Sequence, residues 1–299
     1  MEKKKKNNKN STKIEFLSKY KVIILSVFIL IMVLCVGLLY FRKNVNEICF
    51  EYDNDITKGL VIYGYKCDFI KDVVIPEEID NHEVKEIADY AFYNKGLKSV
   101  DIQANIRKIG YMSFANNELS NIDIPVETEV IGNFAFKENK IDELVLFPKL
   151  TYLGAGAFSF NYIEKLTILE NTNEGLKSIG NHAFESNMLR SVKLPNTLET
   201  IGDYAFAENT LLDEISIPSG VKEIGACALC YNELNTIINK TGKKFDWNRV
   251  LTYGEGDKFM TGSVNINPCD DDDSEDCDIF TEITEEWKEE YSSFFVCLV

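Results

Sequence analysis

The protein has 299 residues and a formal net charge of −16 at pH 7, because 48 acidic side chains outnumber 32 basic ones. Nucleic-acid binding requires cationic side chains that neutralise phosphates, so this composition speaks against nucleic acid as a partner. The acidity favours a cationic partner or divalent ions, although it would also serve solubility alone.

An uncharged apolar segment is the first predicted element along the chain. Residues 22–41, VIILSVFILIMVLCVGLLYF, would span about 30 Å as a helix. The run is longer than the apolar part of a cleaved signal peptide, and no small-residue cleavage site follows it. Leu34, rather than a small residue, precedes Cys35, which disfavours a lipoprotein. The sequence therefore predicts a transmembrane helix.

The charges around this segment predict its orientation. Residues 1–21 contain eight lysines, whereas only Arg42 and Lys43 directly follow the apolar run. Under the positive-inside rule, residues 1–21 form a basic cytoplasmic segment and residues 42–58 form a stalk outside the cell. Residues 1–43 carry a net charge of +8, which leaves −24 for the exterior part. We therefore expect a single-pass membrane protein whose remaining domains are extracellular, at the cell surface.

A unit of about 22 residues recurs seven times in residues 87–238. It contains a hexamer with the consensus I-G-x-x-A-F, then an asparagine, then a run of the form L-x-x-V-x-I. The hexamers start at Ile87, Ile109, Ile131, Leu153, Ile179, Ile201 and Ile224, and successive starts are 22, 22, 22, 26, 22 and 23 residues apart. Such regular spacing is typical of repeat proteins, in which each unit stacks on its neighbours.

Each unit is predicted to contain one short strand. In the unit that begins at Ile179, Val192 and Leu194 alternate with polar Ser191 and Lys193, a pattern typical of a half-buried β-strand. Five of the six prolines in the chain stand where such runs end. A residue without an N–H group stops a strand ladder, so the chain is expected to turn there.

One unit of this size cannot bury its own apolar residues, so the stacked copies must share a core as a solenoid. We expect the last hexamer residues to form one interior column: Phe92, Phe114, Phe136, Phe158, Phe184 and Phe206, with Leu229 in the last copy. A buried amide is tolerated only when it is hydrogen-bonded. We therefore expect the recurrent asparagines to satisfy backbone groups as a buried ladder: Asn117, Asn139, Asn161, Asn187, Asn209 and Asn232.

The unit resembles the BspA-like, or Treponema-type, leucine-rich repeats of bacterial surface proteins. The resemblance covers about residues 60–238 and rests on the I-G-x-x-A-F and L-x-x-V-x-I-P motifs. It implies an α/β repeat fold, a right-handed leucine-rich repeat solenoid of mostly short parallel β-strands with turns and short helical segments. It also implies a binding role, often in adhesion, and an N-terminal cap over residues 59–86. The first copy departs from the consensus, with Ala88 replacing the hexamer glycine and Lys95 the asparagine.

His182, one of only two histidines, lies at the fourth position of its hexamer. The other copies place Tyr90, Met112, Phe134, Gly156, Tyr204 and Cys227 at this position. A set of this kind indicates a half-buried packing column, so we do not expect His182 to be a catalytic residue or a metal ligand.

The segments after the repeats are predicted to be a cap and a tail. Residues 239–267 contain two strand-like pieces, with Phe245 and Trp247 as plugs over the last open apolar face. The tail, 268–299, begins with an acidic run that lacks the spacing of a calcium-binding loop and is interpreted as a solvated linker. Ile279, Ile283, Trp287 and Tyr291 then lie four residues apart, which predicts an amphipathic helix that docks on the solenoid or presents a partner-binding face.

Seven cysteines lie outside the predicted membrane segment, in a compartment that permits disulfides. Cys49 with Cys67 and Cys269 with Cys277 are the plausible pairs. Cys227 and Cys230 form a C-x-x-C at repeat positions that elsewhere carry Tyr204 and Ala207, without the strand-to-helix context of a redox motif. One C-x-x-C with remote histidines also does not make a zinc site.

The outward face of the predicted strands is the candidate partner-binding surface. Its polar members are Asp101, Asn121, Asp123, Glu143, Lys165, Lys193 and Glu214. Seven short strands offer about 450 Å², below the roughly 800 Å² per partner of a standard interface. The face carries no aromatic residue and no arginine, the residue types that dominate binding energy. We therefore expect weak, avidity-dependent contact there, or a binding site elsewhere.

Nothing in the sequence brings together a nucleophile, a base and an oxyanion donor, so the sequence does not predict an enzyme. No cofactor, metal or small-molecule substrate is expected. The favoured hypothesis is a membrane-anchored cell-surface protein that binds an unknown extracellular protein or matrix ligand in adhesion. The alternatives are a surface scaffold or sensor that acts through its C-terminal helix, and an enzyme with an unrecognised site.

Overall fold

The computed structural model describes residues 25–34, 36–37, 48–53, 59–171, 174–252 and 265–268. The chain divides into two units, Met1–Ile48 and Cys49–Val299. In the first unit, residues 25–34 and 36–37 are helical. None of the helices described is both long and apolar enough to cross a membrane. Three predicted regions lie outside the described residues. They are the cytoplasmic segment 1–21, the remaining part of the predicted membrane segment (22–24, 35 and 38–41) and the tail from 269 onward.

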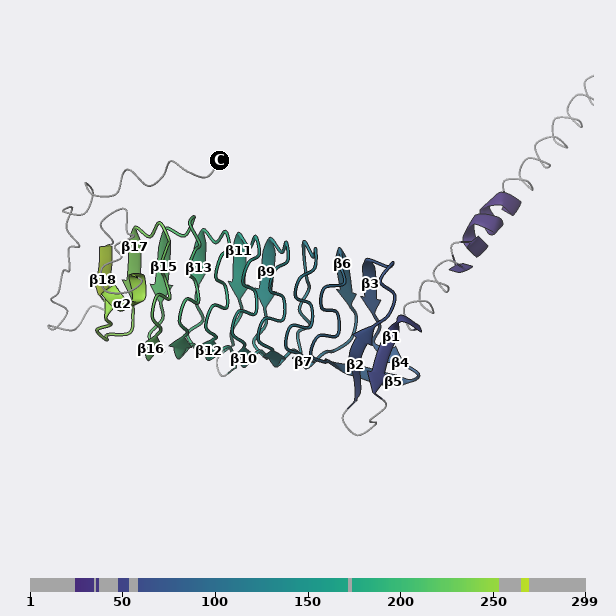
Figure 1. The fold of residues 1–299 in the computed structure, drawn as a ribbon, viewed down its shortest axis with the longest axis horizontal. Coiled ribbons are helices and arrows are strands. Elements are labelled where there is room, and N and C mark those ends of the chain that lie inside the picture. Colours follow the sequence, from purple (N-terminus) through teal and green to yellow (C-terminus); the bar gives the residue numbers. More distant parts are fainter. Residues whose placement is uncertain are drawn as a thin grey trace, which may run out of the picture. The chain divides into compact units, whose positions relative to one another are not determined.

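The second unit is a solenoid built from two rows of parallel strands (Figure 1). One row, the short-strand sheet, has the order β1-β2-β5-β7-β8-β10-β12-β14-β16, with β4 paired to β5. Its strands are β1 (Phe50–Asp53), β2 (Leu60–Tyr65), β4 (Glu78–Ile79), β5 (His82–Ile87), β7 (Lys108–Ile109), β8 (Val130–Ile131), β10 (Tyr152–Leu153), β12 (Ser178–Ile179), β14 (Thr200–Ile201) and β16 (Glu223–Ile224). Only the β1–β2 and β4–β5 pairs are antiparallel among the paired strands described.

The other row contains the L-x-x-V-x-I runs and is divided into two sheets. One sheet has the order β18-β17-β15-β13-β11-β9, and the other pairs β3 with β6. The strands are β3 (Asp72–Ile75), β6 (Ser99–Ile102), β9 (Glu143–Leu146), β11 (Lys165–Ile168), β13 (Ser191–Lys193), β15 (Glu214–Ile217), β17 (Thr236–Asn239) and β18 (Asn265–Pro268). We call this row the long-strand row. The predicted parallel solenoid is thereby confirmed.

The register of the short-strand sheet follows the repeat period. The first residue of each hexamer pairs with the first residue of the next, as in Ile87 with Ile109 and Ile109 with Ile131. These residues are buried, and the residue before each faces outward. A shift by one residue would turn the whole apolar set to solvent, so burial of one face fixes the register.

The hexamers form turns rather than the predicted short helical segments. The fourth hexamer residue has a positive φ in every copy: Tyr90, Met112, Phe134, Gly156, His182, Tyr204 and Cys227 have φ between 49° and 60°. This left-handed conformation does not continue a right-handed helix. The repeats therefore contain no helix among their described residues, and the prediction of helical segments there is wrong.

The phenylalanine column forms the core of the solenoid. Rings in successive copies from Phe92 to Phe206 lie nearly parallel, with centroids 4.9 to 5.9 Å apart and interplanar angles of 3° to 12°. All six rings are fully buried. Burial of one such side chain contributes about 1.5 to 3 kcal/mol, so the column is a main source of stability.

Aromatic and aliphatic side chains close the two ends of this column. At the N-terminal end, the rings of Phe50 and Tyr65 lie 6.2 and 5.5 Å from Phe92. At the other end, Val250 and Leu251 of helix α2 (Trp247–Leu251) are buried, and the Val250 carbonyl accepts the Leu229 N–H at 3.1 Å. Phe245 and Trp247, the predicted plugs, are only half-buried and pack edge to face against each other. Val250 and Leu251, at the end of α2, are the plugging residues instead.

The asparagines form the predicted ladder between copies. The side-chain amide of Asn139 donates to the carbonyl oxygens of Phe114 in the preceding copy and Phe136 in its own, at 2.9 and 3.1 Å. Its Oδ1 accepts the N–H of Leu119 at 3.1 Å. The six recurrent asparagines are 8% exposed or less. Each thus satisfies several buried backbone groups that water cannot reach.

The hexamer glycines allow neighbouring copies to approach closely. A Cβ on Gly110, Gly132, Gly154, Gly180, Gly202 or Gly225 would meet a backbone atom of the preceding copy at 2.3 to 2.7 Å. None of these glycines has a positive φ, so space rather than backbone conformation requires them. The first copy, which stacks on the N-terminal cap, has Ala88 here.

Candidate binding surfaces

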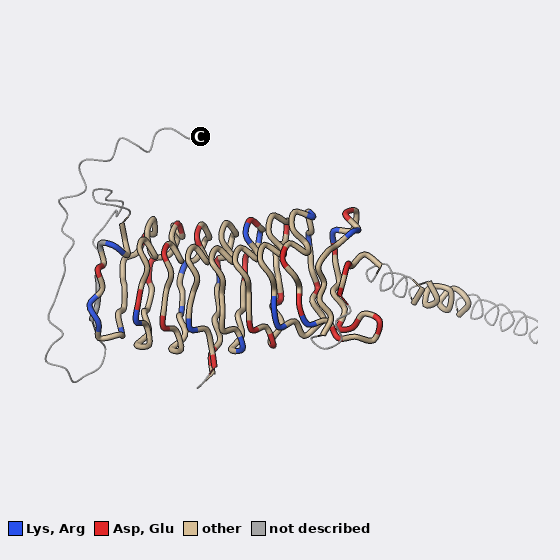
Figure 2. The backbone as a smooth tube through the Cα atoms, turned by 60° about the horizontal axis from the view of Figure 1, so that its bottom comes forward, with Lys and Arg blue, Asp and Glu red and all other residues tan. Residues whose placement is uncertain are grey.

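The structure places the seven predicted partner-binding residues on the exposed side of the long-strand row. Asp101, Asn121, Asp123, Glu143, Lys165, Lys193 and Glu214 are all exposed. The adjacent pair Glu143 and Lys165 forms an ion pair of 3.6 Å. On this face Lys165 and Lys193 follow the acidic members of the earlier copies and precede Glu214, so both signs are present. Acidic and basic residues are also spread along the whole solenoid (Figure 2). This face therefore has no strong charge with which to select a partner.

Two of these residues do not lie on a strand. Residues 121–125 have no strand assignment, although Ile122 and Ile124 are buried as strand residues would be. The continuous row of strands expected from the sequence is therefore interrupted between β6 and β9. Asn121 and Asp123 are residue types that are depleted in strands, and this copy carries both of them within five residues.

A row of aromatic side chains lies on the hexamer turns, away from the predicted face. We call Tyr90, Tyr93, Tyr111, Phe134 and Phe160 the aromatic row. Successive centroids of the first four lie 5.2 to 6.0 Å apart, in the order Tyr93, Tyr90, Tyr111, Phe134. The Lys137 ammonium then lies 5.9 Å from the ring of Phe134 and 5.2 Å from that of Phe160.

These rings remain accessible although they touch one another. Tyr90 is 51% exposed, Tyr93 39% and Phe160 46%. The hydrogen bond to Tyr111 raises the pKa of the Tyr90 hydroxyl, which keeps it protonated. Sequence reasoning assigned Tyr90 and Phe134 to a half-buried packing column and missed the row. Recurrence of aromatic residues at the fourth hexamer position, in Tyr90, Phe134 and Tyr204, was the available signal.

His182 belongs to the packing column, as the sequence indicated. Its ring stacks on that of Tyr204 with a centroid distance of 4.8 Å, and its Nδ1 lies 3.1 Å from Glu185 Oε2. Within the described part of the chain, no group of three or more His, Cys, Asp or Glu side chains could hold a metal ion.

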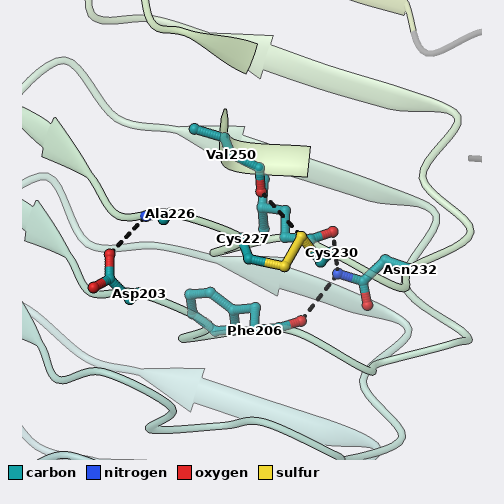
Figure 3. The surroundings of a disulfide bond; sticks show 8 residues. Asp203, Phe206, Ala226, Cys227, Cys230, Asn232 and Val250 are labelled. Carbon is teal, nitrogen blue, oxygen red and sulfur yellow. Dashed lines mark hydrogen bonds between the residues drawn. A yellow bond between two sulfur atoms is a disulfide. The ribbon is translucent and has the colours of Figure 1, made fainter. Parts of the chain in front are cut away.

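In the described part of the chain, two disulfides stabilise the ends of the solenoid. Cys49 and Cys67, a pair suggested by the sequence, are bonded, with their Cα atoms 5.3 Å apart. Cys227 and Cys230 are also bonded, which the sequence reasoning did not anticipate (Figure 3). The hexamer turn brings these two residues together, because the Cys230 N–H donates to the Cys227 carbonyl at 3.2 Å. The other suggested pair, Cys269 and Cys277, lies outside the described residues.

The Cys227–Cys230 bond is buried in the last copy. Both residues are 1% exposed and pack with Ala207, Tyr204 and Tyr231. The Cys227 N–H donates to the Arg249 carbonyl at 2.7 Å, so this turn also holds α2. A disulfide in these surroundings is suited to stabilising the terminal cap, since attack on a sulfur atom requires access.

Ion pairs on the surface join neighbouring copies of the repeat. Hydrogen bonding to Lys140 lowers the pKa of Glu118, and hydrogen bonding to Lys222 lowers the pKa of Glu199. Each of these pairs joins one copy to the next, at 3.1 and 2.5 Å respectively. All four groups are well exposed, so they support the stacking register more than they add stability.

The sequence matches the family described as BspA type leucine rich repeat region, with six copies, over residues 63–175 and 171–246. No curated protein matches it. Among solved structures, a leucine-rich repeat protein from Bacteroides ovatus is 24% identical, with a TM-score of 0.50 over 63% of this chain and 57% of its own. This chain therefore spans less than two thirds of that relative.

A leucine-rich repeat protein from T. pallidum is also similar, with 20% identity and a TM-score of 0.45 over 61% of this chain and 86% of its own. The Bacteroides likeness agrees with the solenoid described above. The family match covers more than half of the chain and includes the hexamers, the asparagine ladder and both ends of the phenylalanine column. The chain therefore belongs to the BspA-type leucine-rich repeat family.

Proposed function

We propose that this protein is a membrane-anchored cell-surface protein that binds another protein or a matrix component through its repeats, without catalysis. Solenoids of this kind offer extended surfaces rather than closed active sites. Support comes from the family and from the aromatic row, which supplies the residue types that dominate binding energy at protein interfaces.

The proposed anchor is the apolar segment 22–41. Its described residues are helical, and the large apolar side chains from Leu25 to Leu34, together with Val36, are 49% to 62% exposed. A helix that is apolar on every side needs burial in protein or lipid. Carbonate extraction of membranes tests this part of the proposal, because a membrane-spanning protein stays in the pellet. Its release into the supernatant would refute the anchor.

The exposure of contiguous aromatic rings carries the binding proposal. Exposure of apolar rings to water is unfavourable. Contact with a partner that buries them contributes roughly 25 cal/mol of binding free energy per Å² of apolar surface removed from water. The long-strand row offers no comparable surface, since none of its described outward strand residues is aromatic, although they include the apolar Val145 and Ile238. The aromatic row is therefore the preferred contact surface, and adhesion is one use of such contact.

The test begins with capture of extracellular partners by the full chain in detergent, followed by affinity measurement for one captured partner. Replacing Tyr93 and Phe160 by serine should weaken binding at least about tenfold, because interface aromatics act as hot spots. Matched serine substitutions at Lys165 and Lys193 test the long-strand row and should change affinity by less than about threefold. The reverse ranking would assign binding to the strand face.

Deletion of residues 268–299 distinguishes the alternative of a scaffold or sensor that acts through its tail. If partner binding persists in the deleted protein, the repeats carry it. Loss of binding, with the solenoid still folded by circular dichroism, would transfer the function to the tail.

A further inference from the structure

A polar groove lies over the short-strand sheet at the C-terminal end of the solenoid. It encloses about 540 Å³, and β12, β14 and β16 form its floor. Its wall consists of Lys244, Phe245 and Asp246, which lead into α2, and of Arg249 and Val250 within α2. This volume lies within the usual range of small-ligand sites, about 300 to 1,000 Å³. The groove is separate from the aromatic row.

The wall of the groove is held in place by the terminal cap. The Arg249 and Val250 carbonyls accept the N–H groups of Cys227 and Leu229, at 2.7 and 3.1 Å. Asp246 Oδ1 accepts the Arg249 N–H at 3.2 Å, and the Phe245 ring packs edge to face on Trp247 at 5.7 Å. The wall is therefore formed before any ligand arrives, which reduces the entropic cost of binding.

The floor offers hydrogen-bond donors and acceptors side by side. Thr200 donates to Ser178 Oγ at 2.7 Å, so the Ser178 hydroxyl proton stays available for a ligand. Asn181 Oδ1 accepts the Asp203 N–H at 3.0 Å, whereas its amide N–H groups have no partner among the residues described. Asp203 uses Oδ1 to accept the Ala226 N–H at 2.6 Å (Figure 3), which leaves Oδ2 as an acceptor.

The charges that line the groove balance. Lys222, Lys244 and Arg249 face Asp203, Glu223 and Asp246, which gives three cations and three carboxylates. Lys222 is also paired with Glu199 at 2.5 Å. A phosphate or a polycation would meet like charges here, and like charges at an interface cost affinity. The groove therefore favours an uncharged ligand.

We propose that this groove binds a short neutral oligosaccharide. Each sugar hydroxyl both donates and accepts hydrogen bonds, which matches the alternation of Ser178, Asn181 and the two carboxylates of Asp203 and Glu223. The apolar C–H face of a sugar ring can lie on the half-buried ring of Phe245. A neutral saccharide thus satisfies every feature of the lining.

The test compares groove variants with substitutions at equivalent repeat positions outside it. Asn133 Oδ1 accepts the Ala155 N–H at 2.9 Å, as Asn181 Oδ1 accepts the Asp203 N–H at 3.0 Å. Asn133→Ala therefore loses the same kind of hydrogen bond between neighbouring copies, outside the groove. Glu86 precedes Ile87 as Glu223 precedes Ile224, so Glu86→Gln is the control for Glu223→Gln. Saturation-transfer NMR of the full chain in detergent would use cellobiose, lactose, mannobiose and chitobiose at about 10 mM.

We expect at least one of these disaccharides to bind, and Asn181→Ala and Glu223→Gln each to weaken it about tenfold. The two control variants should bind as the unmodified protein does. Absence of saturation transfer from all four sugars would overturn the proposal, and so would equal loss in the groove and control variants. Binding of sialyllactose or inorganic phosphate in place of neutral sugars would also refute it. Failure here leaves partner binding by the aromatic row intact, because Tyr93 and Phe160 lie outside the groove.

Discussion

The side-chain amide of Asn161 donates a hydrogen bond of 2.9 Å to the carbonyl oxygen of Phe136, in the preceding copy of the repeat. It also donates to the Phe158 carbonyl at 3.1 Å, and its Oδ1 accepts the Ile141 N–H at 3.1 Å. One buried side chain therefore connects the backbones of two copies. The same residue therefore joins neighbouring copies and provides hydrogen-bond partners for their buried backbone groups.

Replacement of Asn161 by alanine should lower the free energy of unfolding by about 2 to 4 kcal/mol, because it leaves buried backbone groups without partners. Urea denaturation followed by circular dichroism measures this loss. Asn121→Ala, at an exposed position, is the control and should cost less than about 0.5 kcal/mol. Equal costs for the two variants would show that the ladder does not stabilise the stack.

Gly180→Ala should destabilise the solenoid by about 1 to 3 kcal/mol or more, because overpacking forces the backbone apart. The added Cβ would lie 2.6 Å from the Gly154 carbonyl carbon. Ala88→Gly, at the same hexamer position of the first copy, removes a methyl group that already fits and should cost less than about 1 kcal/mol. Thermal unfolding of both variants measures the difference. A larger loss of stability in Gly180→Ala than in Ala88→Gly indicates that close approach of neighbouring backbones requires the glycine, whereas equal losses indicate that these turns tolerate no substitution.

Removal of the Cys49–Cys67 disulfide should lower stability by roughly 3 kcal/mol, the value expected for a closed loop of this length. Cys49 precedes Phe50, whose ring covers one side of Phe92. Serine replacement at both positions should therefore also increase hydrogen exchange at the N-terminal cap. Unchanged exchange there, together with an unchanged denaturation midpoint, would contradict this role.

Alkaline pH should destabilise the N-terminal cap through Tyr65. Burial, together with the smaller effect of the nearby Asp68 carboxylate, raises the pKa of this phenol from 10.0 to about 12. Because the pKa is higher in the folded state, the stabilisation is complete below pH 10 and is lost as the pH rises towards 12.

Tyr65→Phe provides the control for this effect, since phenylalanine keeps the ring contacts with Phe50 and Phe92. Denaturation midpoints measured between pH 9 and pH 12 should fall more steeply in the unmodified protein than in the variant. Identical slopes would exclude Tyr65 as the responsible group.

Much of the fold was predictable because the repeat records the core directly. A residue that recurs once per copy, such as the phenylalanine of each hexamer, must occupy the same place in every turn of a solenoid. The same reasoning placed the buried asparagines, and it assigned His182 to a packing column. Exposed positions such as Glu143 and Lys165 were predicted by the alternation of apolar and polar residues along each strand.

The candidate surfaces were less predictable. The aromatic row depends on the positive φ of residues such as Tyr90 and Phe134, which turns their side chains outward. The groove depends on the position at which residues 244–250 return beside β16. The groove occurs once, so comparison of one copy with the next does not reveal it. In the aromatic row only the fourth hexamer position, occupied by Tyr90 and Phe134, recurs.

The sequence alone determined the number of copies, the residues of the core and the direction in which each strand faces. In a stack of copies, residues that recur once per copy occupy equivalent positions in successive turns. Tertiary structure decided what the turns and ends do: the interruption at 121–125, the bond between Cys227 and Cys230, and the closure of the column by Val250 and Leu251. These outcomes depend on backbone conformation and on contacts that each occur once in the molecule, and a pattern that does not repeat leaves no periodic trace in the sequence.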